Sequence, residues 1–360
     1  LLGELDALRI PEHAFANPET NAAHCCGHHA QMAGVFGAAL ALTVPEIAEK
    51  LDGQVVFFAT PAEEYGEIEF KNQLREQGKI RYGGGKCELL RIGAFDDIDL
   101  CLTHHIRPGN EILVGSGTGN GFVSKVIRVL GKASHAAGAP EKGVNALSAA
   151  SLGLQALGLN RETFRDEDCV RVHPIITKGG NLVNVIPDEV VVETLVRGKT
   201  IEAFTDAAKK TDRSFKAGAI AMGAKVEIST LPGYLPTLAE EALPELKHAA
   251  EISASGIPVI EASGHAGGST DVGDVQHLMP VYTFNTGGVK GGLHQIDFEV
   301  TDEEEAYIVT AKMFALAAYG LLKEKAQRSR ELVDQYEPVF KNSAEYVEFM
   351  EQFDSKEIFE

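Results

Sequence analysis

Tryptophan is absent from the 360 residues, and cysteine and methionine are scarce, with five of each. Five cysteines in a chain of this length do not make a disulfide scaffold. An odd number with one adjacent pair indicates a reducing compartment and predicts a cytoplasmic protein. Basic residues are also few: 33 Lys and Arg stand against 52 Asp and Glu, and the formal net charge is −19. A chain this acidic is a poor candidate for binding nucleic acid or an anionic membrane.

Long apolar runs are missing as well. No run approaches the ~20 residues of a membrane-spanning helix, and no basic and then apolar segment opens the chain as a secretory signal does. Hydrophobic residues make up 44% and charged residues 24%, a normal globular balance, and 360 residues suit two domains. The chain opens without Met and reaches a His/Cys cluster by residue 24.

The pattern of apolar residues predicts an α/β protein with a second domain inserted into the first. Residues 54–60 (QVVFFAT) have the continuous apolar run of a strand buried on both faces, and residues 99–103 follow as a second strand. The glycine-rich segment 115–121 has the composition of a flexible hinge. Beyond it, strands are predicted at residues 122–130, 170–177, 190–197 and 225–230 and helices at 144–157 and 201–222. Their order, strand, helix, strand, strand, helix, strand, is the ferredoxin-like pattern, and residues 231–233 (LPG) are predicted to break the chain again. The predicted catalytic α/β domain comprises residues 1–116 and 232–360, and the inserted α+β domain comprises residues 117–231.

The first concentration of metal-binding side chains is the run HCCGHH at residues 24–29. Cys26 and His28 stand two residues apart, so a thiolate and an imidazole can face one ion across a glycine turn. The alternative is a buried cysteine pair flanked by surface histidines.

Two adjacent carboxylates, Glu63 and Glu64, come directly after the predicted strand 54–60. Catalytic groups of open α/β sheets gather at the carboxyl ends of strands, where one carboxylate can bind metal while the other moves protons. The alternative is an acidic helix start, because Glu favours the first helical turn.

Histidines supply the remaining candidates. His104 and His105 end the second predicted strand, and His294 follows a predicted strand at 281–285. Thiolate, imidazole and carboxylate together suit zinc or a similar divalent ion. His135 lies in the inserted domain and could reach the others only by domain closure or from another subunit.

Taken in order, the motifs resemble those of the M20 family of metallopeptidases and amidohydrolases, in the subgroup of aminobenzoyl-glutamate and N-acyl-amino-acid hydrolases. The resemblance covers residues 3–322, approximately, and as a set the motifs are highly specific. The motifs are DAL, CCGH, PAEE, THH, GKASHAAGAPEKGVNAL, GGNLVNVIPDEV, VRG, GSTDVGDV and GLHQ.

The resemblance implies a zinc-peptidase-like catalytic domain with a mixed sheet, and it implies that the inserted domain is a lid and forms the homodimer. It also implies two divalent ions per subunit, zinc or manganese, with Cys26 as the bridging ligand. The implied ligands are Cys26, His28, Glu64, His105 and His294. Glu63 would be the general base acting on a metal-activated water. His135 would polarise the scissile carbonyl in a neighbouring subunit, while Asn184 and Arg197 would bind the substrate, Arg197 through its carboxylate.

The implied function is therefore hydrolysis of an amide bond in a small substrate with a free carboxylate: an N-acyl amino acid, an aminobenzoyl-glutamate-like compound or a dipeptide. Two departures stand against it, because His29 replaces the usual Asp or Asn and Arg9 replaces the proline of DALP. The alternative is a catalytically impaired family member that binds a small molecule or a partner. A nucleophilic Cys26 is a further alternative, but it lacks an evident supporting acid and leaves Glu63, Glu64 and His294 unexplained.

Overall fold

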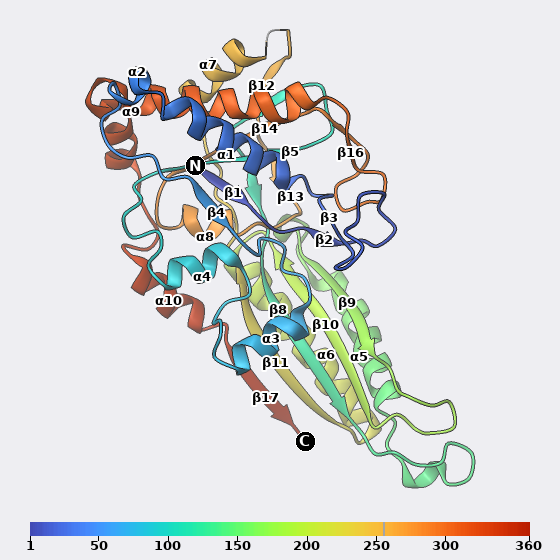
Figure 1. Ribbon diagram of the computed structural model, residues 1–360. Coiled ribbons are helices and arrows are strands. Elements are labelled where there is room, and N and C mark those ends of the chain that lie inside the picture. Colours follow the sequence, from blue (N-terminus) through green and yellow to red (C-terminus); the bar gives the residue numbers. More distant parts are fainter. Residues whose placement is uncertain (255) are drawn as a thin grey trace.

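A computed structural model describes residues 1–254 and 256–360 and contains two separate β-sheets of five or more strands (Figure 1). The first has six strands in the order β12-β6-β14-β5-β1-β4. Only the β14–β6 pair is antiparallel among the described pairs, so the sheet is mixed, as predicted. Its strands are β1 (Leu2–Glu4), β4 (Phe58–Thr60), β5 (Cys101–Ile106), β6 (Ile112–Val114), β12 (Val259–Glu261) and β14 (Val281–Thr286).

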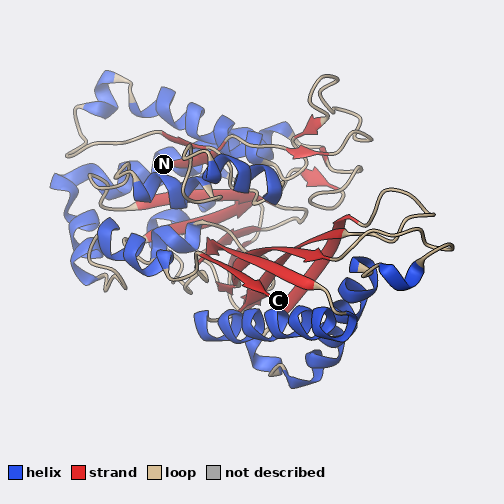
Figure 2. Cartoon of the chain, turned by 90° about the horizontal axis from the view of Figure 1, so that it is seen from below, coloured by secondary structure: helices blue, strands red, loops and turns tan. Residues whose placement is uncertain are grey.

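Helices cover both faces of this sheet (Figures 1 and 2). On one face, Phe284 of β14 packs into a core with Val35 of α1 and Phe314 of α9. On the other face, Val281 packs into a core with Leu90 of α4. The helices of the first face are α1 (His28–Leu42), α7 (Pro244–Ser253) and α9 (Thr310–Gln335); those of the second are α4 (Gly85–Arg91), α8 (Val272–Gln276) and α10 (Ser343–Glu351).

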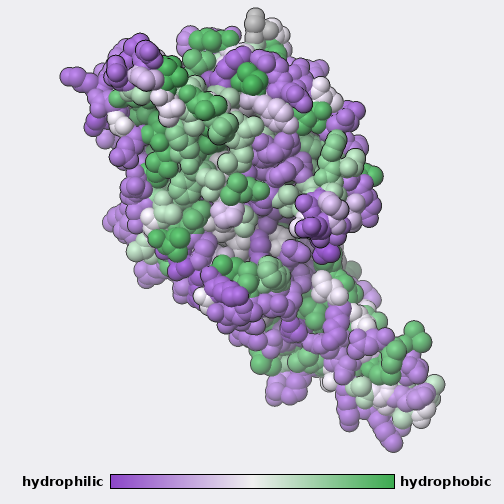
Figure 3. Space-filling model, in the orientation of Figure 1, coloured by the Kyte–Doolittle hydropathy of each residue, from purple (hydrophilic) through white to green (hydrophobic). Residues whose placement is uncertain are grey.

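Helix α9 and the π-helical turn before it, η4 (Glu304–Val309), are long and apolar enough to span a membrane by length and composition alone. However, Met313, Phe314 and Ala317 of α9 are fully buried against the sheet, so their apolar surface is used inside the protein. Hydrophobic side chains also reach the surface around α1, which exposes Phe36 and Leu40 (Figure 3).

The second sheet is antiparallel and has five strands in the order β17-β11-β8-β10-β9. Alternation along β10 directs Val190 and Val192 toward a core with α5 and α6, whereas Val191 faces the opposite side. Helix α6 begins where the Thr200 hydroxyl accepts a hydrogen bond from the Ala203 amide. The elements are β8 (Gly121–Leu130), α5 (Ala146–Asn160), β9 (Arg171–Lys178), β10 (Glu189–Gly198), α6 (Ile201–Met222), β11 (Lys225–Tyr234) and β17 (Ser355–Phe359).

The prediction for residues 54–60 was wrong in extent and burial. Only Phe58–Thr60 forms a strand, β4, and Phe57 beside it is 37% exposed. The reason is position, because β4 lies at the edge of the sheet and pairs only with β1 among the described strands. Strand β5 begins two residues later than predicted and continues through both histidines to Ile106.

The C-terminal part of the chain also differs from the prediction. Strand β11 continues through the Pro232-Gly233 pair, predicted as a break, with a register shift that accommodates the proline. The last strand, β17, returns to the second sheet and pairs with β11, although residues 232–360 were assigned to the catalytic domain.

Short elements complete the fold. In the predicted hinge, the amides of Thr118 and Asn120 donate hydrogen bonds to the carbonyls of Gly264 and Gly268, so the segment is held to the first domain. The remaining elements are α2 (Pro45–Ala48), α3 (Ile68–Glu76), the strand pairs β2 (Leu8–Arg9) with β3 (Ala22–Ala23), β7 (Thr118–Gly119) with β13 (His265–Ala266) and β15 (Val289–Lys290) with β16 (Glu299–Val300), and the 3₁₀ turns η1 (Pro140–Lys142), η2 (Arg161–Thr163) and η3 (Asp166–Asp168).

Candidate metal-binding site

A cavity of about 580 Å³ opens at the carboxyl ends of β1 and β5. Open α/β sheets bind ligands at this end of their strands. Its other walls are the segments 115–119 and 262–270, next to the second sheet. The predicted site residues that line it are Cys26, Glu63, Glu64, His105 and His294.

A glycine turn positions Cys26 and His28 at the start of α1. Gly27 has φ +87°, and a Cβ atom there would lie 2.0 Å from Cγ2 of Ile106. Only glycine fits this left-handed, crowded position. The turn therefore places the thiol and the imidazole on the same side, as the CCGH motif predicts.

The first cluster of candidate ligands is Cys26, His28 and His105, whose ligand atoms lie within 4.8 Å of one another. Cys26 Sγ is 3.4 Å from His105 Nε2. Alternation along β5 separates the two adjacent histidines, because successive side chains of a strand point to opposite faces. His104 is buried beside Phe284, and its Nε2 lies 2.8 Å from Oγ1 of Thr286, so it is a structural residue.

The second cluster is Cys26, Glu64 and His294. His294 Nε2 lies 3.2 Å from Cys26 Sγ and 3.0 Å from Oε1 of Glu64. His294 has φ +63°, a strained value for a non-glycine residue, and its amide is held by the Cys25 carbonyl at 2.8 Å. Cys26 belongs to both clusters, whereas Cys25 is fully buried and points into the core.

The chemistry of these side chains fits a metal centre. Within the described part of the chain, Nε2 of His28 and Oε1 of Glu64 are buried without a well-aligned hydrogen bond, although Glu4 Oε2 lies 3.2 Å from the former and His294 Nε2 lies 3.0 Å from the latter. Buried polar atoms are rarely left unsatisfied, and bound ions would satisfy both. Thiolate, imidazole and carboxylate donors suit zinc and comparable divalent ions.

Two further carboxylates contact His28, and sequence reasoning gave neither a role. Asp6 Oδ1 lies 3.2 Å from Nδ1 of His28, and Glu4 Oε2 lies 3.2 Å from Nε2. Burial opposes ionisation of Asp6, but the His28 ring and the Glu64 amide outweigh it and lower its pKa to about 2. Asp6 would thus orient His28, as carboxylates behind ligating histidines do. The DAL motif signalled Asp6, whereas no motif signalled Glu4.

Glu63 lies on the His28 side of the cavity, unlike Glu64. Its Oε2 is 4.0 Å from Nε2 of His28, and its ligand atom also groups with those of Glu4 and His28. Burial and the nearby charge of Glu4 raise the pKa of Glu63. The two adjacent glutamates therefore occupy different surroundings, which allows different tasks.

The family model for Peptidase family M20/M25/M40 matches residues 1–319. The chain belongs to this family. The predicted family membership is thereby confirmed over most of the chain.

Curated relatives of this M20 chain include hydrolases with different substrates. The Xaa-Arg dipeptidase of Mus musculus is 28% identical over 311 residues, which cover 84% of this chain and 64% of the mouse protein. One of the subunits of the p-aminobenzoyl-glutamate hydrolase of Escherichia coli (strain K12) is 30% identical over 237 residues, which cover 64% of this chain and 44% of that protein. The chain thus spans less than two thirds of the length of these relatives.

The M20 fold is also seen in a solved structure. The Bacillus subtilis YXEP protein, described as a dinuclear metal binding peptidase from the M20 family, matches with a TM-score of 0.59 and 24% identity. The match covers 89% of this chain and 80% of that chain. The two proteins therefore share the fold.

In this M20 chain His29, which stands where the motif usually has Asp or Asn, lies outside the ligand clusters. Its ring lies 5.3 Å from that of His24 and 5.8 Å from that of Tyr307, and it belongs to none of the three clusters. The environment of Cys26 also argues against a cysteine nucleophile. Burial and the charges of Glu64 and Glu63 raise the pKa of its thiol, whereas catalytic cysteines have a lowered pKa.

The predicted substrate-binding residues lie at opposite ends of the second sheet. Arg197 pairs with Phe122 near the first domain, and its guanidinium donates a hydrogen bond to Ser269 Oγ at 2.7 Å, at the wall of the cavity. His135 and Asn184 lie together beyond Leu130, at the far end. Phe122 and Leu130 are eight positions apart along β8, which is about 27 Å at the usual rise of a strand. Neither His135 nor Asn184 lines the cavity.

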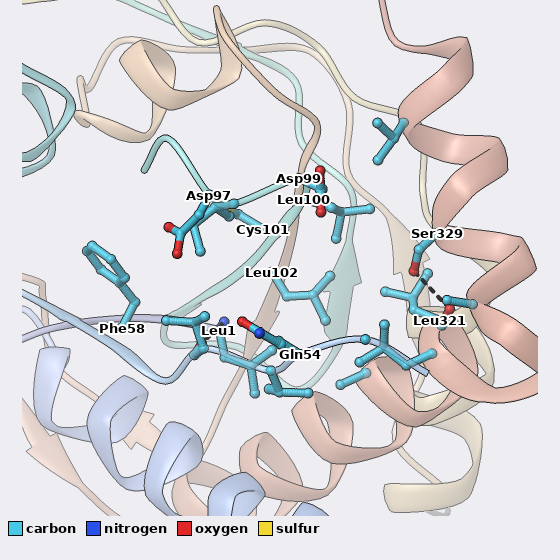
Figure 4. Close-up of a pocket in the computed structure, with 18 of the residues that line it drawn as sticks. Leu1, Gln54, Phe58, Asp97, Asp99, Leu100, Cys101, Leu102, Leu321 and Ser329 are labelled. Atoms are coloured by element: carbon cyan, nitrogen blue, oxygen red, sulfur yellow. Dashed lines mark hydrogen bonds between the residues drawn. The ribbon is translucent and has the colours of Figure 1, made fainter. Parts of the chain in front are cut away.

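A second, larger cavity of about 720 Å³ lies at the opposite ends of the strands (Figure 4). Aliphatic and aromatic residues such as Leu1, Phe58 and Leu102 line it, together with four aspartates that belong to none of the ligand clusters, Asp52, Asp97, Asp99 and Asp334. Its described lining contains neither histidine nor glutamate. The smaller cavity is therefore the candidate functional site.

Proposed function

We propose that this chain is the hydrolytic part of a metal-dependent amidohydrolase. Its substrates would be small amides with a free carboxylate, namely N-acyl amino acids, aminobenzoyl-glutamate-like compounds or dipeptides. The observation that carries the proposal is that Cys26, which lines the cavity, belongs to two clusters of candidate ligands. The names of the relatives support the reaction class, since both act on amides with amino-acid parts.

Five side chains would hold two divalent ions, zinc or manganese: Cys26 between them, His28 and His105 on one side, and Glu64 and His294 on the other. Such ions would lower the pKa of a water molecule and polarise the substrate carbonyl. Glu63 would take a proton from the attacking water and deliver it to the leaving amine. Glu63 lies beside His28 on the cavity wall but outside the two ligand clusters. This position supports a role in proton transfer for Glu63 and a role as a ligand for Glu64.

Arg197 would bind the substrate carboxylate. A guanidinium can grip a carboxylate through two parallel hydrogen bonds. Arg197 is half-buried, stacks over the Phe122 ring at 5.3 Å and has only Ser269 as a side-chain hydrogen-bond partner within the described residues. Its remaining donors are therefore available near the cavity.

His135 and Asn184 would act in the cavity of a second copy, in a homodimer formed through the second sheet. About 27 Å along the strand is too far for a small closure to bridge. The two edge strands of the sheet are β17 and β9, and β9, the longer of the two, exposes Ile175 and Ile176. An open edge with exposed apolar side chains is a surface that pairs readily with another strand. Edge pairing through β9 would make a two-fold dimer.

The test is metal analysis of the purified full-length protein followed by turnover of a substrate panel. The panel contains N-acetyl amino acids, aminobenzoyl-glutamate and dipeptides, each also as its carboxyl amide. We expect bound divalent metal, loss of turnover with a chelator and recovery with zinc or manganese. Bound metal with no hydrolysis across the panel would instead support the small-molecule binding alternative.

A further inference from the structure

The most deeply buried cation near the cavity is Lys86, the second residue of α4, for which neither the motifs nor the proposed reaction provides a role. Its side chain is 0% exposed. The ammonium contacts Glu4 Oε1 at 2.6 Å and Asp271 Oδ1 at 2.5 Å. Among the described residues, no other lysine or arginine pairs with either carboxylate.

The two partners of Lys86 belong to different parts of the site. On one side, Glu4 presents its second oxygen to Nε2 of His28 at 3.2 Å, and Gln31 donates to the same oxygen at 2.8 Å. On the other side, Asp271 lies two residues after Ser269, whose hydroxyl accepts the hydrogen bond from Arg197. Lys86 thus connects a candidate metal ligand with the candidate substrate clamp.

The backbone around Lys86 strengthens this connection. Its amide donates to Oδ2 of Asp271 at 2.9 Å, so both oxygens of Asp271 are taken by one residue. The preceding Gly85 donates to the Ala62 carbonyl at 3.0 Å, next to Glu63, and a Cβ on Gly85 would lie 1.6 Å from the Pro61 carbonyl oxygen. The start of α4 is therefore locked to the loop that carries Glu63 and Glu64.

A buried ion pair of this kind is weak evidence for a stabilising role. Removing charges from water costs several kcal/mol per ion, and well-packed apolar residues often stabilise a fold equally well. The ion pairs of Lys86 can instead orient the side chains that they contact, because residues behind metal ligands fix the direction of those ligands. Burial disfavours the charge of Lys86, but the charges of Asp271 and Glu4 outweigh it and raise its pKa, so the ammonium persists.

We propose that Lys86 is a positioning residue: Glu4 is held beside His28 by Gln31 as well, and Lys86 ties the Ser269–Asp271 segment, and with it Arg197, to this fixed point, so that the substrate clamp stays in register with the metal ligands. The turnover part of this inference rests on the proposed function. The binding part does not, because it concerns metal and carboxylate affinity alone.

The test compares Lys86→Met with Lys125→Met in the full-length protein. Lys125 is the matched control: it is 1% exposed and pairs with Asp212 at 2.7 Å, but it lies in the second sheet. For Lys86→Met we expect kcat/KM for the carboxylate substrate to fall about 10- to 100-fold, as for other residues behind metal ligands. We expect the affinity of the metal-free protein for Zn²⁺ to stay equal or rise, because no ligand is lost and a nearby positive charge is removed. Lys125→Met should leave both quantities, per folded molecule, within about twofold of the parent.

The double variant Lys86→Met/Arg197→Ala tests whether Lys86 acts through the substrate clamp. If Lys86 acts through the clamp, the two losses in kcat/KM should be clearly less than additive. Asp271→Asn should also lower kcat/KM without lowering zinc affinity, but by a smaller factor. This variant replaces Lys86→Met in the test if Lys86→Met does not fold. The inference is overturned if zinc affinity falls together with kcat/KM, which is the mark of a merely structural residue, or if the losses are fully additive.

The proposed function can fail separately. If the parent binds zinc but hydrolyses nothing, the affinity of the zinc-loaded protein for glutamate, measured by calorimetry, replaces kcat/KM. Weaker glutamate binding by Lys86→Met with unchanged zinc affinity supports the positioning role. Unchanged glutamate binding refutes it.

Discussion

The carboxyl edge of the six-stranded sheet and the far end of the five-stranded sheet hold candidate site residues in contrasting surroundings. At the first, contacts of 3.0–3.4 Å link His105 to Cys26, Cys26 to His294 and His294 to Glu64 around one cavity. At the second, the His135 ring accepts hydrogen bonds from the amides of Ala137 and Gly138 in its own loop, and no described side chain bonds to it. Under the proposed function, one chain would supply all of its own metal ligands, whereas His135 would act in the cavity of a second copy.

The different roles proposed for Glu63 and Glu64, at the carboxyl edge of the six-stranded sheet, give the largest expected effect. Glu63→Gln should lower kcat by about 10²- to 10⁴-fold, the scale of a general base, while metal content stays unchanged. Glu64→Gln removes a ligand, so metal content should fall as well. Metal content is measured by mass spectrometry on the same samples as kcat. Equal metal loss in both variants would refute the assignment of roles.

Exchange of subunits between two variants tests the role of His135, at the far end of the five-stranded sheet. His135→Ala should lower kcat by about 10²- to 10³-fold, as the loss of one donor to the developing oxyanion does. Mixing this variant with Glu63→Gln should restore activity to about a quarter of the parent, because half of the dimers are mixed and each has one intact site. The measurement is turnover after subunit exchange verified by native mass spectrometry. Absence of recovery would show that His135 acts in its own chain or not at all.

Arg197 stands between the two regions and gives a smaller effect. Arg197→Ala, or blocking the substrate carboxylate as an amide, should each cost about 2–4 kcal/mol in kcat/KM. Both changes together should cost little more than one, since they remove the same contact. The control is Arg171→Ala, opposite Arg197 on the exposed edge strand β9, which should change kcat/KM by less than about 0.5 kcal/mol. Additive losses would mean that Arg197 and the carboxylate do not meet.

The smallest effect concerns the rate of a single chemical modification. Cys26 should resist alkylation while metal is bound and react after a chelator is added, because the metal-bound thiolate is shielded. Cys25 is fully buried and should stay unreactive, whereas the half-exposed Cys169 should react in both states. Peptide mapping by mass spectrometry distinguishes the three. Equal reactivity of Cys26 with and without chelator would argue against its role as a ligand.

Several parts of the fold could be predicted from sequence periodicity alone. Helix α6 has its predicted bounds, and β8, β10 and β14 lie within one residue of theirs. In each, a strong local pattern agrees with the final packing. Residues 54–60 show where this fails, because a continuous apolar run does not reveal whether a strand lies at the centre or the edge of a sheet.

The order of motifs determined the family and brought forward the five candidate ligands, since residue type and local turns such as Cys26-Gly27-His28 are local properties. Only the tertiary structure decided which neighbours these side chains have. Glu4 and Lys86 are 82 residues apart and carry no motif, yet they meet beside His28 because β1 and α4 pack at the same sheet edge. The tertiary structure likewise separated His135 from the cavity by the length of a strand, and it brought β17 back to the second sheet. Contacts of this kind depend on how distant elements pack, and no local pattern records them.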